Sequence, residues 1–98
     1  MFHIADYKSK QKGFSFISIT KSITSTFTFV SIDPGYDKLK EIVDGSVILN
    51  LVSGNCLLLL NGDTIELPYG PVVLDNGSIY ALKNISKQKA EIYIDFIQ

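Results

Sequence analysis

The sequence predicts an all-β protein, and three observations carry that prediction. Turn-forming residues recur about every 8–12 residues through the middle of the chain, a spacing typical of sandwiches and barrels. Runs of β-branched and aromatic residues lie between the turns, and no segment shows a convincing helical spacing. At 98 residues the chain is long enough for one domain with one core. The turns contain Gly, Pro, Asn or Asp and lie at residues 33–35, 44–45, 53–55, 61–63, 68–70 and 75–77.

The first third of the chain predicts two strands, separated near residues 21–25. Aromatic and β-branched residues stand at strand spacing on both sides of the break. Their parity changes after Phe16 and again after Phe29, which a β-bulge or a bend at a sheet corner would produce. We therefore expect an irregular pair of N-terminal strands.

Residues 37–43 have a composition that suits a helix or a strand, and the flanking turns favour a strand. In a regular strand one face holds Glu41 together with Leu39 and Val43. The opposite face holds Lys38, Lys40, Ile42 and Asp44. Glu41 is therefore expected on the same side as two apolar residues.

Six further strands are expected after Asp44. Asn61-Gly62 tolerates positive φ at both turn positions, which makes this pair the strongest hairpin signal in the chain. The leucines at 57–60 are apolar on both strand faces, which indicates that both faces are covered. In a small domain the second cover is often a partner subunit, so we expect a homodimer. The expected strands lie at residues 47–52, 56–60, 64–67, 72–74, 79–82 and 91–97.

Composition and charge exclude several kinds of partner. The net charge of −1 produces no field that would attract nucleic acid or an anionic membrane. Lys8, Lys10 and Lys12 cluster near the N-terminus, and we interpret them as a solvated patch. No apolar stretch approaches the ~20 residues that cross a bilayer, and no signal-peptide pattern opens the chain. We therefore expect a cytoplasmic protein without nucleic-acid or membrane partners.

The single cysteine, Cys56, cannot form an internal disulfide. It lies within an apolar run, which predicts a buried thiol. A buried thiol in apolar surroundings is unreactive, so no catalytic role is expected for it.

The spacing of two segments resembles the cupin motifs. In the first segment Gly35 is followed by five residues, then Glu41-Ile42-Val43, three residues, Val47, six residues and Gly54. The first cupin motif has a glycine, five residues, His-x-His, three or four residues, a glutamate, six residues and a glycine. In the second segment, residues 70–84, Gly77, Tyr80 and Asn84 keep the Gly-to-His-to-Asn spacing of the second motif. Asp75 stands where that motif has a proline.

This resemblance implies a small single-domain cupin of the RmlC-like kind, with a jelly-roll barrel, or double-stranded β-helix. Residues 34–98 would carry the core barrel, and residues 1–33 would add the N-terminal strands. The family resemblance also supports a homodimer.

The departures from the motifs bear on the chemistry. The family binds a metal ion through two histidines, a glutamate and a third histidine, and these positions carry Glu41, Val43, Val47 and Tyr80 here. Valine has no donor atom, and a carboxylate with a phenol of pKa about 10 makes a poor divalent-metal site. The only histidine, His3, lies outside both motifs. We therefore expect no metal and no other cofactor, and the family's metal-dependent activities do not carry over.

The resemblance implies that Glu41, Val43, Val47, Tyr80 and Leu82 line the barrel cavity. A carboxylate in an apolar cavity has a raised pKa and can act as a general acid or base. Alternatively, Glu41 lies at the rim or pairs with a lysine. Tyr80 would orient a bound sugar or carboxylate through its hydroxyl, or is a core tyrosine with that hydroxyl satisfied nearby.

Three functions follow from these residues. The first is non-enzymatic binding or sensing of a small-molecule ligand, a sugar or a carboxylate. The second is a metal-independent sugar isomerase or epimerase with Glu41 and Tyr80 as catalytic candidates; metal-free enzymes of this kind use histidine bases, and only His3 is available. The third is a structural dimerisation module whose barrel is filled by Val43, Val47, Leu49 and Leu82.

Overall fold

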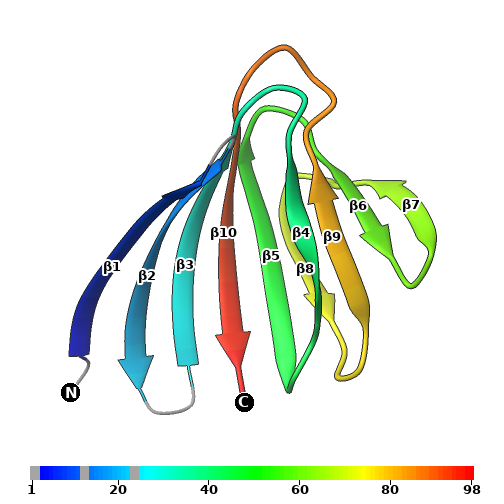
Figure 1. Ribbon diagram of the computed structural model, residues 1–98. Coiled ribbons are helices and arrows are strands. Elements are labelled where there is room, and N and C mark those ends of the chain that lie inside the picture. The colour runs from blue at the N-terminus through cyan, green and yellow to red at the C-terminus, as the bar shows by residue number, and fades with distance from the viewer. Residues whose placement is uncertain (1–2, 12–13, 23–24) are drawn as a thin grey trace.

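The described part of the protein consists of strands and turns (Figure 1). The structure is a computed structural model and describes residues 3–11, 14–22 and 25–98. The predicted all-β class is confirmed, and these residues form no helix that would span a membrane. The strands are β1 (His3–Gln11), β2 (Phe14–Ser22), β3 (Ser25–Ile32), β4 (Asp37–Ile42), β5 (Ser46–Ser53), β6 (Leu57–Leu60), β7 (Asp63–Glu66), β8 (Gly70–Leu74), β9 (Ile79–Lys83) and β10 (Ala90–Ile97).

Two antiparallel sheets enclose the core. The large sheet has the strand order β1-β2-β3-β10-β5-β8, and the small sheet has the order β4-β9-β6-β7. From β3 onward the chain crosses between the sheets at every turn except the β6–β7 hairpin, which stays within the small sheet. This alternation wraps the strands into the predicted jelly roll.

The β6–β7 hairpin confirms the strongest turn signal of the sequence. Leu60 pairs with Asp63, so the loop consists of Asn61 and Gly62 alone. Their φ angles are +50° and +89°, and positive φ at both central positions gives the twist that two-residue hairpins need.

Two other turn glycines are required by close backbone packing. Gly54 has a φ of +78°, and a Cβ atom there would overlap the carbonyl oxygen of Lys89. Gly45 has a φ of +89°, and a Cβ atom there would overlap the carbonyl oxygen of Ile97. Both turns therefore lie against the ends of β10, which fixes where the chain crosses between the sheets.

The core fills the space between the inner faces of the sheets. β5 alternates regularly, so Val47, Leu49 and Leu51 are buried while their neighbours face outward. β9 contributes Tyr80 and Leu82 from the small sheet. Burial of each large aliphatic side chain stabilises the fold by about 1.5–3 kcal/mol. The buried apolar residues are Val30, Ile32, Val43, Val47, Leu49, Leu51, Cys56, Leu58, Leu67, Leu74, Tyr80, Leu82, Ala90, Ile92 and Ile94.

The N-terminal third differs from its prediction. It contains β1 in addition to the two expected strands, because β1 lacks the apolar alternation that marks a half-buried strand. Of the two explanations offered for the parity changes after Phe16 and Phe29, a β-bulge or a bend, the bulge is wrong, since β2 pairs with β3 without a register shift from Phe14 to Thr20, and β3 pairs with β10 without any shift. In β3, Phe27 and Phe29 face outward while Val30 faces the core. The change of parity therefore reflects a strand that is apolar on both faces.

Candidate functional site

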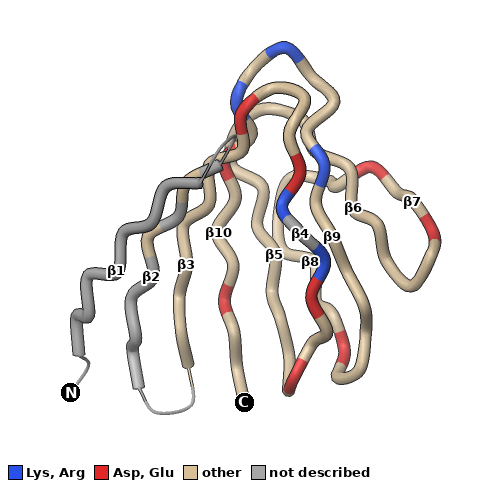
Figure 2. Tube along the Cα trace, in the orientation of Figure 1, with Lys and Arg blue, Asp and Glu red and all other residues tan. Residues whose placement is uncertain are grey.

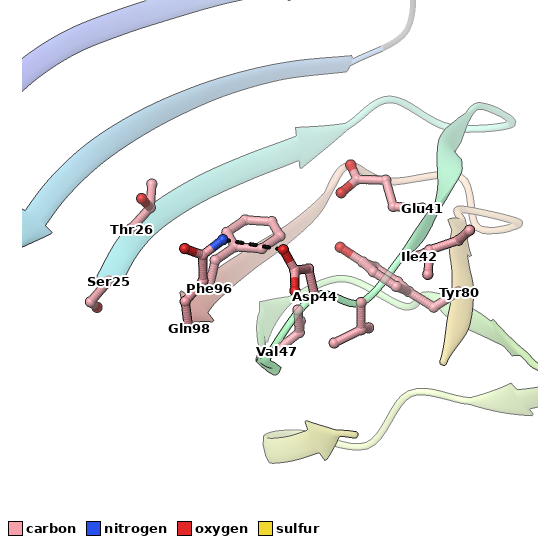
Figure 3. A pocket seen from close by; sticks show the side chains of 10 residues that line it. Ser25, Thr26, Glu41, Ile42, Asp44, Val47, Tyr80, Phe96 and Gln98 are labelled. Carbon is pink, nitrogen blue, oxygen red and sulfur yellow. Dashed lines mark hydrogen bonds between the residues drawn. The ribbon is translucent and has the colours of Figure 1, made fainter. Parts of the chain in front are cut away.

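A pocket of about 280 Å³ lies at one end of the barrel, where the start of β3 and the end of β10 approach the end of β4 (Figure 3). Its volume is close to the lower limit of typical small-molecule sites. Glu41, Val43, Val47 and Tyr80, four of the five residues expected at the cavity, line it. The described residues that line it are Ser25, Thr26, Glu41, Ile42, Val43, Asp44, Val47, Tyr80, Phe96 and Gln98.

The fifth expected residue, Leu82, does not line this pocket. It lies two residues beyond Tyr80 on β9 and is fully buried in the core with Leu49 and Leu58. Strand parity correctly places Leu82 on the inner face, but that face is packed with side chains away from the mouth. Around Leu82 the barrel is therefore filled with side chains, and this pocket lies at its end.

A bulge in β4 changes which residues face the interior. The pairing between β4 and β9 shifts register between Lys38 and Glu41, so Lys38 lies opposite Leu82 and Glu41 opposite Tyr80. Lys38 is only 7% exposed, so its predicted position on one face with Lys40 and Ile42, both of which are exposed, is wrong. The extra residue of the bulge reverses the side-chain alternation N-terminal to Glu41.

Lys38 and Glu41 form an ion pair beside Tyr80. The Lys38 Nζ donates a hydrogen bond to Glu41 Oε1 and lies 5.3 Å from the centroid of the Tyr80 ring. The Lys38 side chain is almost enclosed, whereas 47% of the Glu41 side chain remains exposed toward the pocket. Of the interpretations of Glu41 left open by the sequence, pairing with a lysine is observed, and the half-exposed carboxylate also lies at the rim of the barrel. The pair fixes the carboxylate at the pocket wall.

Tyr80 points from β9 into the group of lining side chains, on the same side as Glu41 (Figure 3). Its hydroxyl is buried and has no hydrogen-bond partner among the described residues. Burial and, secondarily, the Glu41 charge raise the pKa of this phenol well above its usual value. Tyr80 therefore stays protonated at neutral pH and can donate a hydrogen bond. A buried unpaired hydroxyl costs about 1–3 kcal/mol, which a ligand hydroxyl could recover.

The residues at the family's metal positions do not fit a divalent metal ion. Val43 and Val47 offer no donor atom. The Glu41 carboxylate is bound to an ammonium group, and that fixed positive charge repels a second cation. The Tyr80 hydroxyl holds its proton. Within the described residues, no three His, Cys, Asp or Glu side chains gather closely enough to hold a metal ion.

Cys56 and the other residues singled out in the sequence lie outside the pocket lining or outside the described residues. Cys56 is buried, as predicted, and its Sγ–H donates to the carbonyl oxygen of Leu57. Burial raises the pKa of this thiol to about 11, which keeps it protonated and unreactive. The side chains of His3, Leu39, Lys8 and Lys10, and all of Lys12, lie outside the part of the chain that the structure describes.

Sequence reasoning missed six of the ten described lining residues and did not identify Lys38 as the partner of Glu41. Lys38 was missed because the bulge leaves no signal in the pattern of apolar residues. Ser25 and Thr26 come from the start of β3, and Phe96 and Gln98 from the end of the chain. Only the pairing of β3 with β10 brings these distant ends together at the mouth, and no local spacing indicates that pairing.

Comparison with known proteins assigns the fold and nothing finer. No family model and no curated protein matches the sequence. The cupin domain of Cnp3 from Schizosaccharomyces pombe is similar with a TM-score of 0.79 and 18% identity, covering 96% of this chain and 70% of that one. An RmlC-like cupin from Shewanella frigidimarina gives a TM-score of 0.79 at 10% identity, covering 95% of this chain and 84% of that one.

An enzyme is among the similar structures as well. Salicylate 1,2-dioxygenase from Pseudoaminobacter salicylatoxidans has a TM-score of 0.74 at 16% identity, covering 91% of this chain and 26% of that one. Such different proteins on one scaffold show that the fold does not select a function. The resemblance expected from the glycine spacing is nevertheless confirmed at the level of architecture: this chain has the cupin jelly-roll fold.

Proposed function

We propose that the pocket at the barrel mouth binds a small, uncharged, hydroxyl-rich molecule such as a sugar, without a metal ion and without converting it. The protein would then act as a sensor or an accessory binding protein. The single observation that carries this proposal is the Tyr80 hydroxyl, which is buried at the pocket and has no hydrogen-bond partner in the described part of the chain. A ligand hydroxyl at the inner end of the pocket would supply that partner.

The rest of the lining suits a sugar. The fixed Glu41 carboxylate is a hydrogen-bond acceptor beside the Tyr80 donor, so one ligand hydroxyl can accept from Tyr80 and donate to Glu41. Ser25, Thr26 and Gln98 add neutral polar groups, and the Phe96 ring offers an apolar surface. Polar groups converging on an apolar floor are typical of small-molecule sites.

The charges of the lining disfavour the second ligand class suggested by the sequence, a carboxylate. Glu41 and Asp44 both line the pocket, and none of the lining residues that the structure describes carries a positive charge. The nearby ammonium of Lys38 is already bound to Glu41. A ligand carboxylate would therefore meet two like charges without a counter-ion.

A binding titration tests this proposal. Neutral monosaccharides, the corresponding uronates and the corresponding amino sugars are titrated separately, with binding followed by protein NMR chemical shifts. We expect the neutral sugars to bind more tightly than the uronates, and Tyr80→Phe to weaken binding about 5–10-fold through one lost hydrogen bond. Tyr36→Phe, an exposed tyrosine remote from the lining, is the matched control. Tighter binding of the uronates, or identical affinity in Tyr80→Phe, would contradict the proposal.

One observation favours a second candidate, a metal-independent enzyme acting on sugars. Glu41 is a fixed carboxylate and Tyr80 a protonated phenol in the same pocket, so they offer a proton acceptor and a proton donor to a bound substrate. Glu41→Gln distinguishes the two functions. An enzyme would lose turnover while retaining binding, whereas a binding protein has no turnover to lose.

The third candidate, a structural module with a filled barrel, agrees with the burial of Val43, Val47, Leu49 and Leu82. The pocket above them argues for a ligand instead. For all three candidate functions, the cytoplasmic location and the absence of nucleic-acid and membrane partners stay predictions from the sequence.

A further inference from the structure

A second pocket lies on the outer face of the small sheet, and we call it the outer pocket. Its volume is about 290 Å³, similar to that of the pocket at the barrel mouth. The outward residues Ile79 and Ala81 of β9 line it. Tyr80, which lies between them, belongs to the lining of both pockets, so the two pockets lie on opposite sides of β9. The other described residues that line the outer pocket are Lys40, Leu59, Asn61 and Gly62.

The floor of the outer pocket is apolar, and a small side chain gives the pocket its depth. Ala81 lies directly opposite Leu59 of β6, a strand that is uncharged along its whole length (Figure 2). On the other side of Ala81, Lys40 lies in the bulge of β4. A single methyl group between two longer side chains leaves a hollow. The Asn61-Gly62 turn forms the wall at the end of β6.

Lys40 is the only charged residue among the described residues of this lining. It is exposed and forms no ion pair within the part of the chain that the structure describes. Of the nearest acidic residues, Glu41 is bound to Lys38, and Asp63 pairs with Leu60, whose side chain packs toward the core on the other face of the hairpin. Lys40 therefore offers an unpaired ammonium group beside an apolar floor.

The other charged residues of the outer face lie in the next row of the sheet. Asp37 pairs in register with Lys83, and Leu57 lies between Lys83 and Glu66. This row is two residues from Ala81 along β9, which corresponds to about 7 Å. It holds two carboxylates around its single ammonium group, so the charge of Lys83 is already compensated. The uncompensated positive charge of this face is at the outer pocket.

Asn61 adds a hydrogen-bond donor at the wall of the outer pocket. Its Oδ1 accepts a hydrogen bond from the Ile79 N–H at 2.8 Å, and its own N–H donates to the Ile79 carbonyl oxygen at 2.8 Å. These two bonds hold the turn against β9 and fix the side-chain amide. The Nδ2 group has no partner among the described residues, so it can donate to an oxygen atom of a bound molecule.

We propose that the outer pocket binds a small apolar carboxylate, such as an aromatic or a branched-chain acid. The apolar body would lie on Leu59, Ile79 and Ala81, and the carboxylate would lie at the Lys40 ammonium. A volume near 300 Å³ suits a single ring or a short branched chain. An uncharged analogue would cover the same apolar surface but leave Lys40 unpaired, and a cationic analogue would be repelled.

This site is independent of the sugar proposed for the barrel mouth. The two pockets share only Tyr80 among their described lining residues, and the charges of the two linings are opposite. The sequence also predicts a partner subunit over the leucines at 57–60, and the homodimer stays a prediction. A subunit packed over Leu59 would exclude a ligand from the outer pocket, so the two occupants give different results in a titration.

The test is a set of titrations followed by methyl NMR on the whole chain. Benzoate, benzamide and benzylamine carry the same ring with a negative, neutral and positive group. For benzoate we expect saturable shifts of the Leu59, Ile79 and Ala81 methyl signals, with a Kd of about 1–5 mM. Benzamide should bind about 3–5-fold more weakly, and benzylamine more weakly still. The signals of Val43 and Val47, which line the mouth pocket, should not move.

Three outcomes of these titrations would overturn the proposal. The first is the absence of saturable shifts up to about 20 mM benzoate, which is also the result expected if a partner subunit covers the pocket. The second is shifts confined to Val43 and Val47. The third is binding of benzamide as tight as that of benzoate. None of these results bears on sugar binding at the mouth, which is titrated separately.

Substitutions separate the charge from the apolar floor. Lys40→Met keeps an unbranched apolar side chain, and it should weaken benzoate binding about 3–5-fold and leave benzamide binding unchanged. Lys83→Met removes the same charge from the neighbouring row and is the matched control, with an expected change below about 2-fold. Ala81→Leu fills the hollow and should abolish binding of both compounds. Equal benzoate affinity in Lys40→Met and Lys83→Met, or retained binding in Ala81→Leu, would overturn the proposal.

Discussion

The two sheets bury similar residues on their inner faces but differ in the number of charged residues that their strands carry. Leu49 and Ile94 of the large sheet and Leu58 and Leu82 of the small sheet are all fully buried. Outside, β3, β5 and β8 are uncharged, whereas the small sheet carries lysines and acidic residues on β4, β7 and β9 (Figure 2). Three of the uncharged strands, β3, β5 and β8, therefore belong to the large sheet, and β6 is the uncharged strand of the small sheet.

The inner face of the small sheet also holds a charged side chain, that of Lys38, and this side chain lies at the candidate site. The bulge in β4 turns Lys38 inward, where it binds Glu41 next to Tyr80. Polar groups on an inner face are costly unless they are paired, so their presence at the mouth indicates a function other than stability. The following predictions test the comparison, from the largest expected effect to the smallest.

Equal burial on the two inner faces predicts equal and large losses of stability. Leu49→Ala and Leu82→Ala should each lower the free energy of unfolding by about 2–5 kcal/mol, because each removes buried contacts and leaves a cavity. The measurement is urea denaturation at a fixed protein concentration. A loss below about 1 kcal/mol for Leu82→Ala would indicate that the small sheet is not part of the core.

The inward lysine predicts a difference between two lysines of the same strand. Lys38→Met leaves the Glu41 carboxylate without its counter-ion and should cost about 1–2 kcal/mol of unfolding free energy. This is less than for a fully buried pair, because Glu41 is half-exposed and solvent screens its charge. Lys40→Met removes the same charge at an exposed position and should change stability by less than about 0.5 kcal/mol. Equal losses of unfolding free energy in the two variants would contradict the inward position that the bulge gives Lys38.

The buried phenol predicts a loss of stability in alkali. The pKa of Tyr80 is raised in the folded state, so above pH 10 the unfolded chain releases a proton that the folded protein retains. The free energy of unfolding therefore falls as pH rises through the ordinary tyrosine pKa, and Cys56 adds a loss of the same sign between pH 9 and about 11. Tyr80→Phe should flatten the curve above pH 10. The same slope in this variant and in the wild type would show that Tyr80 is not buried as described.

The sequence predicted much of the barrel because its signals are local. Turn glycines such as Gly54 are required by close backbone contacts, and they divide the chain from β4 to β10 into nearly correct strands. The motif spacing also selected Glu41, Val43, Val47 and Tyr80, which line one pocket.

Features that depend on pairing between distant strands could not be predicted. The inward position of Lys38 results from a register shift between β4 and β9. The contribution of Ser25 and Gln98 to the pocket results from the pairing of β3 with β10. The apolar outer face of β3 produced a change of parity in the sequence that was interpreted as a bulge. The alternation of apolar and polar residues cannot distinguish a strand that is apolar on both faces from an irregular strand.

The most direct test of the central claim is a titration of the protein with Mn²⁺, followed through the methyl NMR signals of Val43 and Val47. The motif resemblance places these two residues where cupins have metal ligands, so an ion held there would broaden their signals strongly and saturably. We predict no saturable broadening up to about 1 mM Mn²⁺, because the donor set is inadequate and Lys38 already supplies a cation. Stoichiometric broadening of both valines at micromolar Mn²⁺ would contradict the account.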